Sequence, residues 1–236
     1  LCFGDFGTIR VDSAFGGATR LALGNSLTFD FTVDGVGNVT VNATTPSANA
    51  DSISTVNGWD GPAGTVSDAA LFGTSFTLTA SGERRNNAGT VFDPVGISGD
   101  GLQGGGTIGI FGQNASVIDG ATLPNGNIER IVFTISSGAV TATLNAFSFT
   151  GNAASDPTVT TDSASKNYFN NGVGAVNTSA DGLSLATGGF LRFEVLDEEG
   201  AGDPTEGYRL NALTFDTTSV PEPSSALLSG LALVGL

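Results

Sequence analysis

Apolar and polar side chains alternate in short runs along most of this chain, and this period of two limits the fold more than any other feature. In the run from 26 to 33, SLTFDFTV, every second residue is apolar. Successive side chains of a β-strand point to opposite faces of a sheet, so such a run has one face for a core and one for solvent. The pattern returns in TSFTLTA, IERIVFTI, FLRFEVL and YRLNALTF, and helical periodicity is nearly absent before Val220. The alternation therefore predicts an all-β protein.

Gly, Asn and Asp residues separate these runs and predict how the strands connect. The segment DGVGN, residues 34–38, predicts a Gly-rich turn between two strands. In the run AVTATLNAFSF the apolar positions change parity, which predicts a β-bulge near Asn145. The acidic segment 197–207 is expected to join the last two strands as a hairpin. The weakly patterned stretch 151–181 is expected to be a loop excursion or a seam between two sub-domains.

Short strands at this spacing are typical of an antiparallel β-sandwich, and a jelly-roll-like form is preferred. Hydrophobic residues make up 39% of the chain and include 16 Phe, so a core is expected in spite of the 35 Gly. We expect one β-sandwich domain over residues 1–218. A separate tail, residues 219–236, is expected to form a short C-terminal apolar helix.

The charge and the missing residue types exclude several functions. The formal net charge is −15, from 23 acidic and 8 basic residues, and such a surface repels nucleic-acid backbones. There is no His, and Cys2 is the single cysteine, which excludes histidine-dependent triads, Cys-rich metal sites and a disulfide framework. A pair of carboxylates is the remaining catalytic possibility. Glu194 shares its strand face with Arg192, away from the apolar face, so we expect it on the solvent side or over the rim of a second sheet, and expect no enzyme.

Calcium is the cofactor that the acidic segments could hold, because Ca²⁺ prefers carboxylate and carbonyl oxygens. In DEEGAGDPTEG, Asp197, Glu199, Asp203 and Glu206 could converge on one ion, and an ordinary solvated loop is the alternative. Glu129 is a second candidate, because its parity points it toward the core at the start of a strand. A carboxylate there needs backbone N–H groups, an arginine or a cation as its partner, and the N–H groups of the preceding turn are favoured.

Aromatic residues offer a second kind of site, a contact for carbohydrate. Trp59, Tyr168 and Tyr208, with Phe169, are the candidates, because aromatic rings stack on the apolar faces of pyranose rings. These residues are scattered along the sequence, and packing in the core is the alternative interpretation.

The tail, SVPEPSSALLSGLALVGL, departs from the pattern of the body. Leu and Ala favour a helix over a strand, and prolines suit the entrance of a helix. As a helix, the apolar run 226–236 would be about 17 Å long, short of the ~30 Å hydrocarbon core of a membrane. Met is absent even at position 1, and the run stops without basic residues. We therefore expect that segments are missing at both ends.

The tail resembles the PEP-CTERM sorting signal of exported bacterial proteins. Pro221, Glu222 and Pro223 match the recognition triplet of that family, and the run 226–236 matches the first part of the helix that follows it. The second half of that helix and the family's Arg cluster do not appear in this sequence. The resemblance implies export, temporary attachment to the membrane through the C-terminal helix, and processing by an exosortase.

Body and tail together lead to one functional hypothesis. We expect a secreted, non-enzymatic protein of a Gram-negative, polysaccharide-producing bacterium, located in the cell envelope, at the cell surface or in the extracellular matrix. Its role would be structural or adhesive, through weak contact with exopolysaccharide. The alternatives are a lectin-like carbohydrate-binding module and a polysaccharide-degrading enzyme with two carboxylates in one cleft.

Overall fold

The structure is a computed structural model, and two sheets account for nearly all of its regular elements. It describes residues 7–12, 21–22, 24–44, 64–86, 91–100, 107–110, 118–119, 127–138, 140–151, 156–168, 174–195 and 207–220. Within these ranges the strands pair antiparallel, and the one helix is the short 3-10 helix η2 (Ala69–Leu71). The all-β prediction is confirmed. No helix in the described ranges is long and apolar enough to cross a membrane, and the helix predicted for the tail lies outside them.

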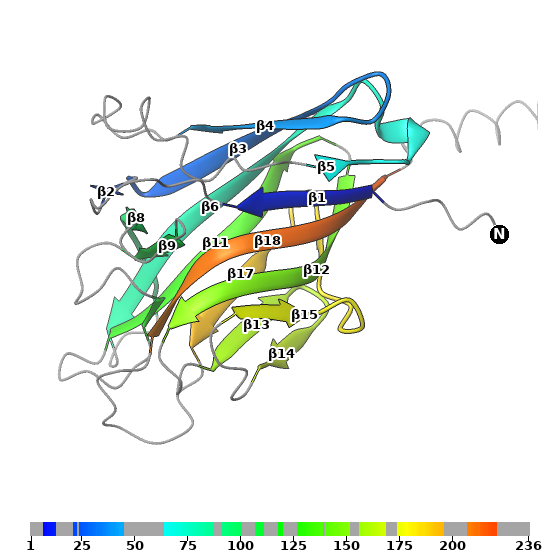
Figure 1. The fold of residues 1–236 in the computed structure, drawn as a ribbon. Helices are drawn as coiled ribbons and strands as arrows, with labels where there is room; N and C mark the ends of the chain where they lie inside the picture. The colour runs from blue at the N-terminus through cyan, green and yellow to red at the C-terminus, as the bar shows by residue number, and fades with distance from the viewer. Residues whose placement is uncertain are drawn as a thin grey trace, which may run out of the picture.

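The first sheet has ten strands in the described part of the chain. They are β1 (Gly7–Asp12), β2 (Leu21–Ala22), β5 (Gly64–Thr65), β8 (Ile97–Asp100), β9 (Thr107–Ile110), β10 (Ile118–Asp119), β12 (Val140–Gly151), β15 (Gly174–Asn177), β16 (Ser184–Ala186) and β18 (Gly207–Ser219). β18 is the hub of this sheet, because β12 pairs along one of its edges and β1, β9 and β10 also pair with it. Figure 1 shows β1 and β18 side by side, although they come from opposite ends of the chain.

The second sheet has eight strands in the described ranges. They are β3 (Ser26–Val33), β4 (Val39–Thr44), β6 (Ser75–Asn86), β7 (Asp93–Val95), β11 (Asn127–Ser137), β13 (Pro157–Thr161), β14 (Ser165–Asn167) and β17 (Leu191–Val195). Their order is β14–β13–β17–β11–β6–β3–β4, with β7 added beside β6. β6 and β11, in the middle, form the longest pair of this sheet.

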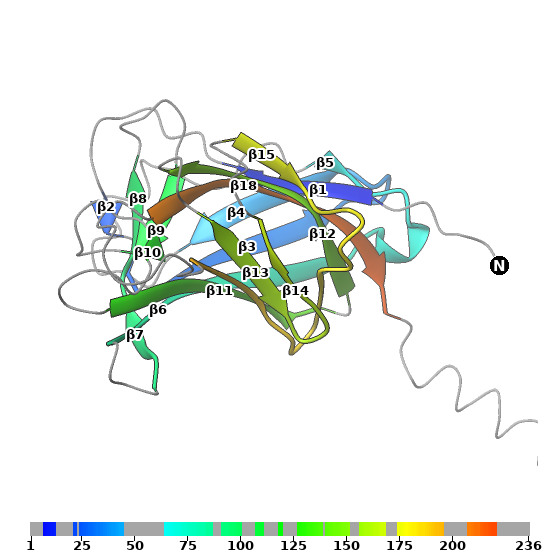
Figure 2. The ribbon, with the colours of Figure 1, turned by 90° about the horizontal axis from the view of Figure 1, so that it is seen from below.

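Aromatic side chains fill the space between the two sheets. Figure 2 shows β1, β12 and β18 in one layer and β6, β11 and β13 in the other. The ring of Phe147, on β12, meets the ring of Phe193, on β17, edge to face with centroids 5.3 Å apart. Phe193 in turn meets Phe133 of β11 at 5.8 Å. All three side chains are buried, so the core is continuous from one sheet to the other.

The local predictions hold where the structure describes them. In β3 the apolar positions of the alternating run are buried and the polar positions lie at or near the surface. The turn at 34–38 joins β3 to β4 as an antiparallel pair. The register between β12 and β18 shifts between Leu144 and Ala146, which confirms the bulge predicted near Asn145.

Two predictions about connections are wrong. β17 and β18, predicted as a hairpin, belong to different sheets, because β17 pairs with β11 and β13 whereas β18 pairs in the first sheet. The stretch 151–181, predicted as a loop excursion or a seam between two sub-domains, contains the strands β13, β14 and β15, which belong to the two sheets. β13 does not show the period of two because most of its residues are buried, including two of its three threonines, Thr158 and Thr161.

The turn between β3 and β4 is held by one carboxylate and one glycine. Asp34 Oδ1 accepts hydrogen bonds from the backbone N–H groups of Val36 and Asn38, and Oδ2 accepts one from the Asn38 amide. These bonds, the one from the Asn38 side chain first, hold the pKa of Asp34 below its usual value. Gly37 has a φ of +89°, and its carbonyl accepts a hydrogen bond from Val66 N at 2.8 Å. The turn is therefore fixed against the chain that leads into η2.

Replacing Gly37 by Ala is expected to lower the free energy of unfolding by about 2 kcal/mol or more. A positive φ costs an L-residue ~1–2 kcal/mol, and the added Cβ would overlap Val66 O and approach the Phe72 ring. Gly35→Ala, in the same turn, is the matched control, because a Cβ there meets nothing within 4 Å. Urea denaturation of both variants measures the difference. Equal losses at the two positions would show that the close approach at Gly37 does not matter.

Candidate functional site

β6 and β11 present oppositely charged pairs to both faces of the second sheet. The register places Glu83 opposite Arg130 and Arg84 opposite Glu129. Neighbouring residues of a strand point to opposite faces, so one pair points outward and the other inward. The same two strands thus hold similar groups in solvent and in the core.

The inward pair consists of Arg84 and Glu129. Glu129 is fully buried, and its Oε1 accepts a hydrogen bond from Arg84 Nε at 2.7 Å, with Nη2 at 2.6 Å. The inward direction predicted for Glu129 is confirmed. The arginine was one of its predicted partners, whereas the sequence favoured backbone N–H groups. In the described part of the chain, no group of three His, Cys, Asp or Glu side chains could hold a metal ion.

The outward pair belongs to a cluster that we call the outer patch, which consists of Glu83, Phe92, Arg130, Phe190, Arg192 and Glu194. Arg130 Nε donates to Glu83 Oε2 at 2.6 Å. Arg192 Nε and Nη2 lie 3.1 Å and 2.9 Å from Glu194 Oε1. The four charged side chains are between 19% and 27% exposed, so the prediction that Glu194 lies with Arg192 on the solvent side is confirmed.

Both arginines of the outer patch also lie over aromatic rings. The guanidinium carbon of Arg130 is 3.5 Å from the centroid of the Phe92 ring, and that of Arg192 is 5.6 Å from the centroid of Phe190. These separations are in the range of cation–π contacts. Each guanidinium is therefore held by a carboxylate and by a ring, which fixes its orientation.

A hollow of about 240 Å³ lies within the outer patch. It is lined by Glu83, Arg130, Val132, Phe190 and Arg192. Val132 and Phe190 supply apolar surface, and the other three supply charged hydrogen-bonding groups. The hollow is smaller than the ~300 Å³ of the smallest typical small-molecule pockets, so it suits contact with one ring of a larger ligand.

Hydroxyl groups extend the polar outer face beyond the patch. Thr160 lies opposite Arg192 in the register of β13 and β17, and its hydroxyl is 2.9 Å from that of Ser165. Farther along β6 and β11, the strands that carry Glu83 and Arg130, the hydroxyls of Thr79 and Ser136 are 3.4 Å apart. The charged pairs thus have hydroxyl groups beside them in two directions.

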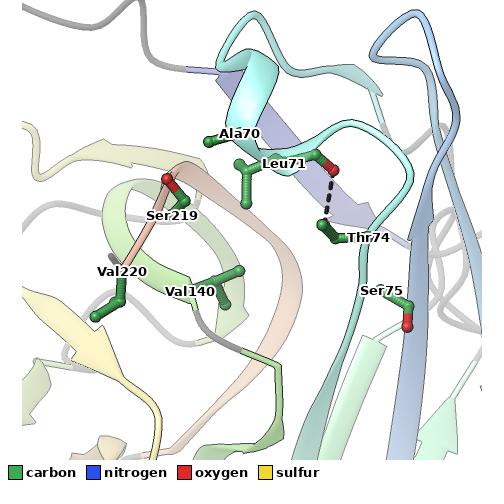
Figure 3. Close-up of a pocket in the computed structure, with 7 residues that line it drawn as sticks. All are labelled: Ala70, Leu71, Thr74, Ser75, Val140, Ser219 and Val220. Carbon is green, nitrogen blue, oxygen red and sulfur yellow. Dashed lines mark hydrogen bonds between the residues drawn. The ribbon is translucent and has the colours of Figure 1, made fainter. Parts of the chain in front are cut away.

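A second hollow, of about 180 Å³, lies beside the C-terminal end of β18. Figure 3 shows its lining, which consists of Ala70, Leu71, Thr74, Ser75, Val140, Ser219 and Val220. Its side is formed by the turn after η2, where the Thr74 hydroxyl donates to Leu71 O at 2.7 Å. Val220 is 42% exposed at its mouth.

Asp68 ties the end of β18 to η2 beside this second hollow. Its Oδ1 accepts a hydrogen bond from Ala70 N at 3.0 Å, and its Oδ2 accepts from Ser219 N and from the Ser219 hydroxyl, both at 3.2 Å. Burial alone raises the pKa of Asp68, but the hydrogen bonds from Ser219 and Ala70 outweigh it and leave the pKa below its usual value. The carboxylate form of Asp68 therefore holds the end of β18 against η2.

Several predicted site residues lie outside the described ranges. These are Trp59, the predicted calcium ligands Asp197, Glu199, Asp203 and Glu206, and the sorting triplet Pro221, Glu222 and Pro223. Phe169 lies outside them as well. The calcium and sorting predictions therefore stay predictions.

Tyr168 and Tyr208 are core residues rather than a sugar platform. Tyr208 has no exposed surface, and its hydroxyl donates to Glu194 O at 3.1 Å. Tyr168 is 8% exposed and donates to Asp181 Oδ2 at 2.8 Å. Burial, with the nearby carboxylates, raises the pKa of both phenols. The structure removes both rings from the predicted carbohydrate contact, because neither has a free face to stack on a sugar.

The chain was also compared with known proteins. No protein-family model, no curated protein and no solved structure matches it.

The two charged pairs of β6 and β11 are expected to differ in their contribution to stability. Glu129→Ala leaves Arg84 without its buried carboxylate and should lower the free energy of unfolding by about 3–5 kcal/mol. Glu83→Ala breaks the matching pair on the outer face and should cost less than about 1 kcal/mol. Chemical denaturation of the two variants gives both values, and a Glu83 variant as unstable as the Glu129 variant would contradict the assignment of faces.

Asp68 is expected to make the folded state acid-sensitive. Because its pKa is lower in the folded chain than in the unfolded chain, its contribution is complete above the unfolded value and is lost as the pH falls through the folded value. The stability difference between wild type and Asp68→Asn should therefore shrink as the pH falls from about 5 to about 2. Thermal unfolding at several pH values measures this difference. A difference that does not change with pH would show that the Asp68 charge does not hold Ser219.

Proposed function

We propose that this chain is the body of an exported, non-catalytic surface or matrix protein with a structural or adhesive role. The supporting observation is where β18, the last strand in the described residues, ends. Asp68 anchors Ser219, and the Pro-Glu-Pro triplet begins at Pro221, so one residue separates the anchored strand from the motif. A sorting signal that begins at Pro221 would follow almost directly on a strand of the first sheet. The body, residues 1–218, would be a jelly-roll-like sandwich, and residues 219–236 the signal.

The partners and the location follow from the tail. An exosortase would recognise Pro221, Glu222 and Pro223 during export, and the apolar run 226–236 would begin the helix that holds the protein in the membrane before processing. The processed protein would remain in the envelope, at the surface or in the matrix of a Gram-negative bacterium. Exopolysaccharide would be its neighbour there.

The outer patch supports a binding role over a catalytic one. Glu83 and Glu194 lie on β6 and β17, with β11 between them, so their backbones are about 10 Å apart at ~4.8 Å per strand spacing. Each carboxylate binds an arginine rather than facing the other across an open groove. A glycosidase instead needs two carboxyl groups free to act on opposite sides of one glycosidic bond.

A carbohydrate-binding module is the second candidate function, and the outer patch favours it. The patch combines aromatic rings, oriented arginines and glutamates beside one hollow. These groups can bind hydroxyls and cover the apolar face of a sugar ring. Such binding would be the adhesive contact of the protein rather than a separate activity.

The sorting proposal is tested with the complete gene, tagged within the body, in a Gram-negative host with and without its exosortase. We expect a shortened form in the surface fraction with the exosortase, and a longer membrane-bound form without it. Replacing Pro221, Glu222 and Pro223 by Ala should give the longer form in both hosts, whereas Ser224→Ala should not. Unshortened protein in the cytoplasm of both hosts would refute the proposal.

A further inference from the structure

We infer that the outer patch binds an uncharged polysaccharide, with Phe190 as the stacking ring and Arg192 as the principal hydrogen-bond donor. The inference rests on the proposed adhesive role, and it names both the surface and the class of ligand for that role. Neither residue belongs to the aromatic set that the sequence indicated.

The hollow has the two kinds of surface that a sugar ring needs. A pyranose has apolar C–H faces and a rim of hydroxyls. Phe190 and Val132 supply apolar surface in the hollow, while Arg130, Arg192 and Glu83 supply charged hydrogen-bonding groups. A ring lying on Phe190 would place its hydroxyls toward these groups.

The arginines are oriented before any ligand arrives. Arg130 uses its Nε for Glu83, and Arg192 uses Nε and Nη2 for Glu194. Among the contacts of the described residues, Glu83 and Glu194 do not use Nη1 of either arginine, which leaves this nitrogen for a ligand hydroxyl. Phe190 is also held, because its backbone N–H donates to Asp162 Oδ2 at 3.1 Å. Groups that are already ordered lose less entropy on binding.

The charges favour an uncharged ligand over an acidic one. The chain carries a formal net charge of −15, which repels polyanions. Glu83 lines the hollow itself, and Glu194 lies beside it in the patch, where the two partly cancel the charge of the arginines. A carboxylated sugar would approach these glutamates, whereas neutral hydroxyls can donate to carboxylates and accept from guanidinium groups.

The flanking hydroxyls favour a chain over a single sugar. From β13 to β6 the outer face crosses three strand spacings, about 14 Å. Thr160 and Ser165 lie beside Arg192 at one end of this surface, and Thr79 and Ser136 lie farther along β6 and β11 from Glu83 and Arg130. An extended glycan that runs obliquely over these strands would therefore meet polar partners beyond the hollow that binds its central ring.

Calorimetric titration of the full chain with neutral hexasaccharides tests the inference. The probes are cellohexaose, mannohexaose and laminarihexaose, with hexagalacturonate as the charged comparison, at about 50 mM and about 500 mM salt. We expect one neutral probe to bind with little dependence on salt, and hexagalacturonate to bind more weakly. Absence of binding by every neutral probe would overturn the inference and leave the sorting test unaffected.

Two variants locate the site. Phe190→Ala should weaken binding of the neutral probe about fivefold to tenfold, from loss of one aromatic contact. Arg192→Lys keeps the charge but loses the planar fork, and should weaken binding about fivefold. Val36→Ala changes a residue that is 74% exposed on the β3–β4 turn, and should have no effect. Arg192→Lys also serves if Phe190→Ala fails to fold.

These measurements test separately whether the chain binds carbohydrate and whether the outer patch is the place where it binds. Binding that is unchanged in both variants would overturn the assignment to the outer patch while keeping a carbohydrate-binding role. Stronger binding of hexagalacturonate, lost at high salt, would overturn the uncharged class of ligand. Weakened binding in both variants, with normal unfolding curves and an unaffected Val36→Ala control, would support the inference.

Discussion

The packing of Phe147 against Phe193 is the contact on which the rest of the structure depends, because it joins the two sheets. Each sheet has one apolar face, and neither face is stable in water until the other covers it. Once these rings meet, the period of two decides the direction of every other side chain on β17. The same packing that buries Phe193 directs Arg192 and Glu194, its neighbours in sequence, to the outer face.

The period of two was enough to predict the class of fold and several local features. It placed the core residues of β3, and the change of parity in β12 located a bulge that the register with β18 confirms. The alternation could not show that β17 and β18 belong to different sheets, because a strand alternates in the same way whichever strand it pairs with. β13 was missed for a related reason, since a strand whose polar residues are also buried does not alternate.

The candidate site, too, could be predicted only in part from the alternation of apolar and polar residues. Alternation placed Glu194 and Arg192 on the outer face correctly, but the neighbours that make a patch come from β6 and β11, and only the register brings Arg130 beside them. The prediction of a sugar contact at the two tyrosines was wrong for a different reason. Tyr168 and Tyr208 were candidates because of their residue type, which carries no information on direction, whereas Phe190 adjoins a strand whose charged side chains already point outward.

The place of β18 has a consequence for the order in which the chain can fold. It is the last strand in the described part of the chain, yet Ile9 of β1 and Leu144 of β12 both lie opposite Phe215 within it. When the chain emerges with its N-terminus first, from a ribosome or through a membrane pore, β1 and β12 cannot pair with β18 until residues 207–219 have emerged. The first sheet therefore cannot be completed during the synthesis of the strands that precede β18, whereas the second sheet, which does not contain β18, can form before it.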